Sequence, residues 1–189
     1  SKDSVQGYTY NPDKARSLLQ KAGYPGGRGM KPIKLTTTDD YRDLCEFIQH
    51  QLSEIGIELH IEISTGATFR DMVANSKLLF FRGSWIADYP DAENYLALFY
   101  GENFSPGGPN YTHYNNSRYD RLYKKALNTM DPEKRQRYYR QMDRMIIEDA
   151  PVVPLYYDQV VRFTHTHVTG LGSNPMNLLV LKYVKKEAP

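Results

Sequence analysis

The chain has 189 residues and carries 24 lysine and arginine residues against 22 aspartate and glutamate residues. This length suits one domain, or one domain with a small part of another, and the interspersed charges exclude the concentrated basic patch that nucleic-acid binding requires. No stretch approaches the ~20 apolar residues of a membrane-spanning helix, and a single cysteine, Cys45, excludes a disulfide within the chain.

The first half of the chain alternates between helix and strand patterns. Asn11-Pro12-Asp13 combines an N-cap residue, proline at the first helical position and an acid at the positive end of the helix dipole, so a helix is expected up to Gly23. The elements expected after it are a strand at 33–37, a helix at 41–55, a strand at 57–63, a helix at about 69–75 and a strand at 78–81. This βαβαβ series predicts a layered α/β lobe with a sheet flanked by helices.

The second half is mostly helical at first. A helix is expected over 90–100, followed by a Gly, Pro, Asn and Ser-rich stretch, 101–116, that is too long to be a plain connector. Two more helices are expected, at about 118–130 and 132–149, the second with a buried stripe of Tyr138, Met142, Met145 and Ile146. After them we expect an extended, edge-like strand at 150–157 and final strands at 160–163 and 178–183.

The stretch from Phe80 to Asp91 carries the most chemistry. It reads as a strand covered on both faces that leads into a turn with the only tryptophan, an arginine and two acids. A helix start follows it. Strand, polar turn and helix start form the arrangement in which α/β proteins hold ligands, so this turn is the predicted binding site.

Three segments carry a resemblance to a known family. R-G-S-W-x-x-D-Y-P-D (Arg82 to Asp91) resembles the G-W-x-x-D-Y-P-D-P signature of the peptide-binding proteins of bacterial ABC importers, solute-binding family 5, departing from it at Ser84 and Ala92. N-P-D-K-A-R-S-L-L-Q-K-A-G-Y (Asn11 to Tyr24) and A-P-V-V-P-L-Y-Y (Ala150 to Tyr157) resemble further family segments in the same order. The resemblance covers residues from Tyr10 to about Tyr183.

The resemblance implies a lobe of the type II periplasmic-binding-protein fold, with a mixed β-sheet flanked by helices. Residues 1–160 would form the C-terminal ligand-binding lobe, and residues 161–189 would return to a missing N-terminal lobe of the same protein. The implied partners are a peptide ligand and an ABC permease in the membrane. The implied location is periplasmic or at the cell surface as a lipoprotein, with the signal sequence outside this chain. No cofactor and no enzymatic activity are expected.

The resemblance also assigns ligand-binding roles. Asp88 would accept the α-ammonium group of a bound peptide, because an ammonium in a closing cleft needs a carboxylate; the alternative is a loop acid that caps the next helix. Trp85 would wall a side-chain pocket or belong to the core. Arg82 would hold a carboxylate or form a structural ion pair. The predicted ligand-binding residues are Arg82, Gly83, Ser84, Trp85, Ile86, Asp88 and Tyr89, and the backbone from Gly83 to Ile86 would pair with an extended peptide.

Several alternatives remain open. Relatives in the family also take sugars, metal chelates and haem. A hydrolase using Asp88, Asp91 and Glu93 as an acid/base pair, and an interaction domain using the 16 tyrosines, are the rivals from other classes. His165-x-His167 would face one side of a strand, but a third metal ligand is not evident nearby.

Overall fold

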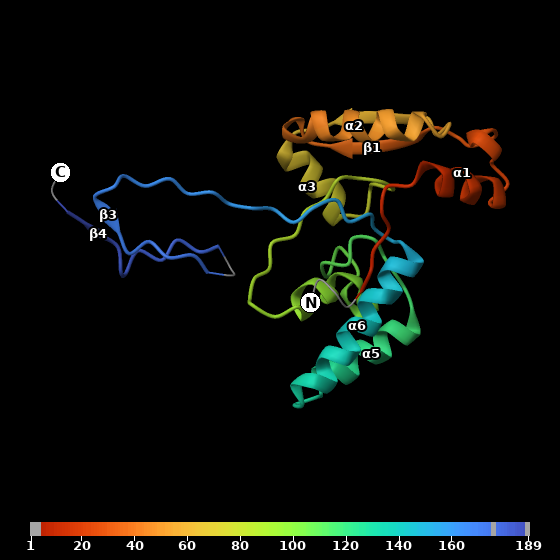
Figure 1. The fold of residues 1–189 in the computed structure, drawn as a ribbon. Coiled ribbons are helices and arrows are strands. Elements are labelled where there is room, and N and C mark those ends of the chain that lie inside the picture. Colours follow the sequence, from red (N-terminus) through yellow and green to blue (C-terminus); the bar gives the residue numbers. More distant parts are fainter. Residues whose placement is uncertain (1–4, 175–176, 188–189) are drawn as a thin grey trace.

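The computed structural model describes residues 5–174 and 177–187 of the chain. It consists of two separately packed halves and a long C-terminal extension that points away from them (Figure 1). We call residues 33–82 the sheet half, residues 85–149 the helical half, and the described residues from 150 onward the arm. The helices and strands are α1 (Pro12–Lys21), β1 (Ile33–Thr37), α2 (Arg42–Ser53), β2 (Leu59–Ile63), α3 (Gly66–Ala74), α4 (Glu93–Leu96), α5 (Ser117–Leu127), α6 (Pro132–Asp149), β3 (Val168–Thr169) and β4 (Lys185–Lys186).

The sheet half confirms the predicted α/β pattern. β1 and β2 are parallel, paired from Ile33 with Leu59 to Thr37 with Ile63, and the connecting helix α2 packs against them as a crossover. The core of this half consists of Leu35, Cys45 and Leu59, and Cys45 is fully buried. α3 begins three residues earlier than expected, because the side chain of Thr65 accepts from the backbone N–H of Thr68 and caps the helix.

The expected strand at 78–81 is wrong. Only Phe81 forms an isolated parallel bridge, to Thr36 of β1. Leu79 is fully exposed and Phe80 is 38% exposed, so this run is not covered on both faces. A short apolar run does not distinguish a buried strand from an apolar surface, because its periodicity is the same in both cases.

The helical half is built around the antiparallel pair α5 and α6, whose starts the sequence predicts. Asn116 caps α5 and Asp131 caps α6 through side-chain oxygens. The buried face of α6 contains Met142, Met145 and Ile146 as predicted, but Tyr139 and not Tyr138 completes it. The expected helix at 90–100 is shorter than predicted: α4 ends at Leu96 and a 3-10 turn, Ala97–Phe99, continues it.

The long loop at 101–116 is packed around one residue. Asn110 is fully buried, and its amide nitrogen donates to the carbonyls of Tyr100 and Tyr114 at 3.1 and 3.0 Å. Its amide oxygen accepts from the Thr112 hydroxyl and the Tyr114 N–H. Side-chain amides that replace missing backbone partners hold a loop in one conformation, so this segment presents fixed positions to its neighbours.

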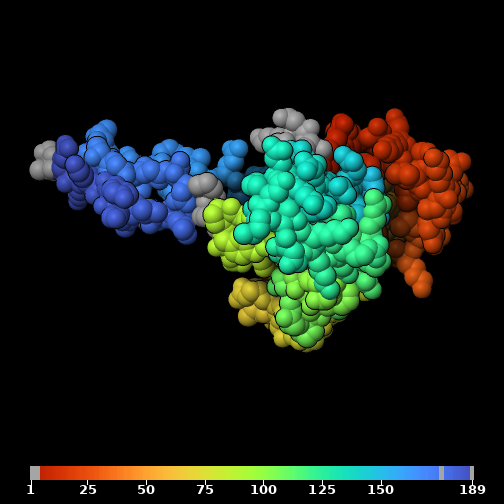
Figure 2. All heavy atoms as spheres, turned by 90° about the horizontal axis from the view of Figure 1, so that it is seen from below, coloured from red at the N-terminus to blue at the C-terminus, as the bar shows by residue number. Residues whose placement is uncertain are grey.

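The arm leaves the end of α6 and extends away from both halves (Figures 1 and 2). The strands expected at 150–157, 160–163 and 178–183 do not form. The arm contains only the short antiparallel pair of β3 and β4, with Val168 opposite Lys186 and Thr169 opposite Lys185. An extended segment becomes a strand only where another backbone supplies hydrogen bonds, and large apolar side chains of the arm are exposed: Val153, Leu155, Tyr156, Tyr157, Val160, Val161, Phe163, Leu178, Leu179, Val180, Leu181 and Tyr183. Within residues 5–174 and 177–187, no helix has the length and apolarity to cross a membrane.

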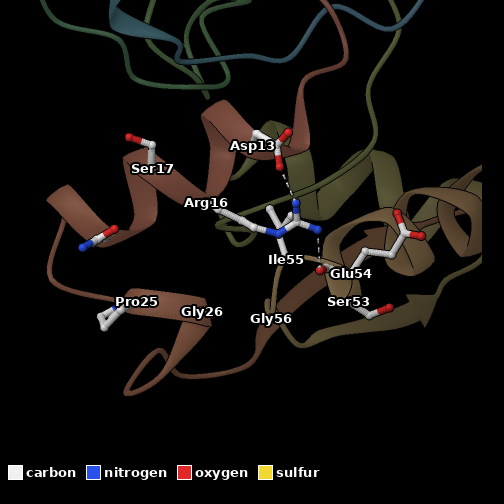
Figure 3. A pocket seen from close by; sticks show the side chains of 10 residues that line it. Asp13, Arg16, Ser17, Pro25, Gly26, Ser53, Glu54, Ile55 and Gly56 are labelled. Carbon is white, nitrogen blue, oxygen red and sulfur yellow. Dashed lines mark hydrogen bonds and ion pairs between the residues drawn. The ribbon is translucent and has the colours of Figure 1, made fainter.

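Two glycine-containing loops cross between α1 and the end of α2, beside the pocket drawn in Figure 3. Gly27 has φ 75° and Gly56 has φ 84°. A Cβ atom at Gly27 would lie 1.7 Å from the carbonyl oxygen of Gly56, and one at Gly56 would lie 2.2 Å from the carbonyl oxygen of Gly26. Arg16 fills the neighbouring space, where it bonds Asp13 at 2.8 Å and the carbonyl of Glu54 at 3.3 Å (Figure 3).

Gly56→Ala is expected to destabilise the protein more than Gly23→Ala. Both glycines have positive φ, so both substitutions carry a backbone strain of about 1–2 kcal/mol. Gly23 has nothing within 4 Å of its added Cβ, whereas Gly56 meets backbone atoms of Gly26 and Gly27. The clash should add about 1–3 kcal/mol, measured as the difference in the free energy of unfolding in urea. Equal losses in the two variants would contradict the close crossing.

Candidate functional site

The predicted binding residues lie on the loop that connects the two halves, and its first end belongs to the sheet half. The N–H of Arg82 donates to the Thr36 carbonyl of β1 at 3.1 Å. Its guanidinium lies 3.2 Å above the ring centroid of Tyr41, where attraction to the ring face stabilises a cation. The Nε atom of Arg82 is buried and has no hydrogen-bond partner among the described residues. No ion pair of Arg82 is found there either, so the structural ion pair considered from the sequence does not form within this part of the chain.

The second end of the loop is held by Asn94 of α4, a residue that the sequence analysis missed. Asn94 is only 4% exposed. Its amide oxygen accepts the indole N–H of Trp85 at 2.6 Å and the backbone N–H of Asp88 at 3.3 Å. The orientation of the indole and the position of Asp88 therefore depend on the same buried oxygen. Nothing in the sequence distinguishes this asparagine from other polar residues of the helix.

The side chain of Asp88 points to solvent. It is exposed, and its carboxylate forms no hydrogen bond or ion pair within the described residues. The capping role that was the alternative for Asp88 is filled by Asp91, whose Oδ1 accepts the N–H of Glu93 at 3.0 Å. The carboxylate of Asp88 is thus left available for a group from outside the lobe.

Two neighbouring acids, Asp91 of the loop and Glu93 of α4, have partners within the structure. Asp91 forms an ion pair with Arg135 at 3.0 Å and accepts from the Tyr139 hydroxyl at 3.0 Å. Glu93 accepts from the hydroxyls of Tyr89 and Tyr123. These contacts fasten α4 to α5 and α6. An acid/base pair for hydrolysis needs two carboxylates that face a substrate. The carboxylates of Asp91 and Glu93 instead bond side chains of the protein, whereas that of Asp88 faces solvent.

The remaining predicted residues are neighbours of Asp88 on the same loop. Gly83 and Ser84 are exposed, and their backbone crosses from one half to the other. Ile86 is 81% exposed and Tyr89 is 43% exposed, whereas Trp85 is half-buried. The loop therefore exposes the carboxylate of Asp88, the side chains of Ile86 and Tyr89, and open backbone groups.

The histidine pair of the arm offers less. His165 and His167 stack with ring centroids 5.3 Å apart. In the part of the chain that the structure describes, no cluster of three or more His, Cys, Asp or Glu side chains is arranged to hold a metal ion. In the described residues, the two histidines of the arm therefore lack the further ligands that a metal site requires.

Comparisons with known proteins agree on one family. The sequence model of "Bacterial extracellular solute-binding proteins, family 5 Middle" matches residues 1–107. Heme-binding protein A of Haemophilus influenzae is 27% identical over 177 residues, which are 92% of this chain and 32% of that protein. Glutathione-binding protein GsiB of Salmonella choleraesuis is 29% identical over 178 residues, 91% of this chain and 35% of that protein.

A solved structure shows the same likeness in three dimensions. The dipeptide-binding protein of Pseudoalteromonas sp. SM9913, in complex with Met-Leu, is 27% identical and superposes with a TM-score of 0.74 over 94% of this chain and 36% of that protein. The fold is that of the type II periplasmic binding proteins, as expected. The chain spans about a third of the length of the curated relatives it matches.

Asn94→Ala is expected to release the indole of Trp85 and destabilise the protein by about 1–3 kcal/mol, because the indole N–H and the Asp88 N–H lose their buried acceptor. Trp85 is the only tryptophan of this chain, so its fluorescence emission should shift to longer wavelength. Asn115→Ala, at an exposed position, is the matched control. An unchanged emission spectrum in Asn94→Ala would contradict this anchoring.

Tyr139→Phe is expected to change how stability depends on alkaline pH. Burial, together with the hydrogen bond to Asp91, raises the pKa of Tyr139 from 10.0 to about 12. The folded state thus retains a proton that the unfolded chain loses, so this stabilisation is full below pH 10 and is lost as the pH rises to 12, by about 1.4 kcal/mol per pH unit.

The difference in unfolding free energy between parent and Tyr139→Phe should therefore narrow from pH 9.5 to 11.5 in urea titrations. Tyr157→Phe, at a side chain that is 90% exposed, controls for the loss of one tyrosine. A constant difference across this range would show that Tyr139 does not keep its proton preferentially in the folded state.

Proposed function

Because the chain belongs to family 5 of the bacterial extracellular solute-binding proteins, we propose that it forms the C-terminal ligand-binding lobe of the substrate-binding component of an ABC importer. In this proposal residues 1–160 form the lobe, and residues 161–189 return to an N-terminal lobe of the same protein. The ligand is an extended peptide, held between the lobes and delivered to a membrane permease.

The observation that carries this proposal is the carboxylate of Asp88. It is exposed and has no partner within the described residues, yet its backbone is fixed by Asn94. A carboxylate that is positioned but unpaired suits a cationic group, and the α-ammonium of a peptide loses less free energy in a closing cleft when it meets one. The likeness to a protein solved with the dipeptide Met-Leu supports a peptide ligand.

The neighbouring residues supply the other contacts in this proposal. Trp85 provides an aromatic wall for a side chain, and the exposed backbone from Gly83 to Ile86 pairs with the ligand main chain. The guanidinium of Arg82, stacked on Tyr41, binds a ligand carboxylate. Ile86 and Tyr89 border the same surface. Contacts of this kind recognise the main chain and the termini of a peptide, so they accept many sequences.

The portion of the arm from residue 161 onward supports the part of the proposal that concerns a second lobe. Its large apolar side chains are exposed, and its backbone lacks the sheet partners that an extended segment requires. An N-terminal lobe would supply both. Hinge closure of the two lobes over the ligand then creates the form that the permease recognises. A location outside the cytoplasmic membrane, with a lipoprotein anchor outside this chain, fits this role.

The relatives also favour a second ligand class. Heme-binding protein A and glutathione-binding protein GsiB match nearly the whole chain, so the same lobe is compatible with ligands other than simple peptides. Sugars and metal chelates belong to the same alternative. An interaction domain that uses its tyrosines is less well supported, because several of them bond acids inside the helical half.

The test is the thermal unfolding of the full-length protein with trialanine, N-acetyl-trialanine, glutathione, haem, maltose and a nickel chelate. A ligand at 100 times its dissociation constant adds about 2.7 kcal/mol of stability. Trialanine should stabilise the parent strongly and its acetylated form weakly. Asp88→Asn should weaken trialanine binding by about 100-fold or more, because the ammonium is left without its carboxylate.

Asp40→Asn, at an exposed acid of the sheet half, is the matched control and should bind like the parent. Equal stabilisation by both trialanine forms would refute the role of Asp88. Stabilisation by haem, maltose or the chelate alone would retain the family and replace the peptide.

A further inference from the structure

The two charged groups of the binding loop belong to different halves of the molecule. Arg82 is attached to the sheet half through Thr36 and Tyr41, whereas Asp88 is attached to the helical half through Asn94. Only exposed backbone at 83–84 lies between the bound ends. The distance between the guanidinium and the carboxylate therefore depends on how the two halves are oriented.

The halves have separate hydrophobic cores. The core of the sheet half consists of Leu35, Cys45 and Leu59, and that of the helical half is formed by α4, α5, α6 and the turns next to α4. No buried residue is shared between these two clusters. The orientation of the halves must then be set by contacts at their boundary, because each core stabilises only its own half.

One polar cluster bridges this boundary. Ser76, at the end of α3, places its hydroxyl oxygen 2.7 Å from the Ser105 hydroxyl and 2.9 Å from His113 Nε2. The same Nε2 lies 3.0 Å from the Ser105 hydroxyl and 2.9 Å from the Ser105 carbonyl. Among residues 5–174 and 177–187, the bonds from Ser76 to Ser105 and to His113 are the side-chain hydrogen bonds that join the sheet half to the helical half. The segment before α1 also reaches the sheet half, through an exposed bond from Tyr10 to Glu54.

The cluster is packed on the side of the helical half, while the side chains of Ser76 and His113 are exposed. The ring of His113 stacks on Phe104, with centroids 4.8 Å apart and planes 10° from parallel, and Asn110 organises the loop that carries both rings. Ser76 and His113 have φ values of 54° and 51°, a left-handed conformation that costs free energy for residues with a Cβ. Both side chains reach the cluster from these unusual backbone positions.

We propose that Ser76, Ser105 and His113 form a joint that fixes the orientation of the two halves and thereby positions Arg82 relative to Asp88. The three residues act through the loop and are positioning residues, since none of them belongs to the predicted binding surface. The effect of the joint on ligand binding rests on the proposed function, but the existence of the joint does not. Ser105 is 4% exposed, so removing the imidazole leaves a buried hydroxyl with only the Ser76 hydroxyl as partner and weakens the contact between the halves.

The joint is tested by a distance measurement on the full-length protein. Spin labels are attached at His60→Cys on β2 and Lys125→Cys on α5, both exposed positions, while Cys45 is fully buried and remains unlabelled. His113→Phe preserves an aromatic ring for the stack on Phe104 but removes the nitrogen. It should broaden the distribution of distances between the labels or shift its mean, compared with the parent.

Three further variants make the result specific. His113→Gln keeps a nitrogen donor and should restore a distribution closer to that of the parent. Ser76→Ala removes only the hydroxyl contributed by the sheet half, so it tests the joint even if His113→Phe does not fold. His50→Phe, at an exposed histidine of α2, should leave the distribution unchanged.

Trialanine affinity provides the second readout, and it should fall by about fivefold or more in His113→Phe and Ser76→Ala. A parent-like distance distribution in a folded His113→Phe or Ser76→Ala protein would overturn the joint. If trialanine fails to bind even the parent, the proposed ligand is wrong, and the distance distributions still decide whether the joint exists.

Discussion

The candidate site depends on the hydrogen bonds made by the buried amide oxygen of Asn94. This oxygen accepts hydrogen bonds from the indole of Trp85 and from the backbone of Asp88, so one atom sets the direction of an aromatic face and the backbone position of Asp88. An unpaired N–H in a partly buried setting costs free energy. The two N–H donors, of Trp85 and Asp88, therefore stay bonded to Asn94 and hold the loop against α4. The loop is thus preorganised before any ligand arrives, which lowers the entropy lost on binding.

The acids Asp88, Asp91 and Glu93 show how local contacts give similar side chains different roles. Asp91 and Glu93 are satisfied by Arg135 and by tyrosine hydroxyls of α5 and α6, and they hold α4 in place. Asp88 lies only three residues before Asp91 but has no such partner within the described chain. The structural acids support the fold, and the carboxylate of Asp88 is left without a partner among the described residues.

The molecule is divided into small cores, and this division links stability to function. The sheet half and the helical half each pack around their own apolar residues, while the arm leaves much of its apolar surface exposed. A binding protein that closes by hinge motion requires parts that move as units. The proposed joint of Ser76, Ser105 and His113 would hold the two halves together as one such unit, and an apolar arm is consistent with docking on another lobe.

The sequence by itself determined the elements whose signals are local. Asn11 marks the start of α1 through its own side chain, and α5 and α6 begin within one residue of the predicted starts at 118 and 132. The W-x-x-D-Y-P-D motif located the candidate loop. The tertiary structure alone decided that residues 78–81 are not a covered strand, that the arm is not a set of strands, and that Asn94 and Tyr41 contact the loop. Strand formation and buried polar contacts depend on partners distant in sequence, so neither residue pattern nor periodicity reveals them.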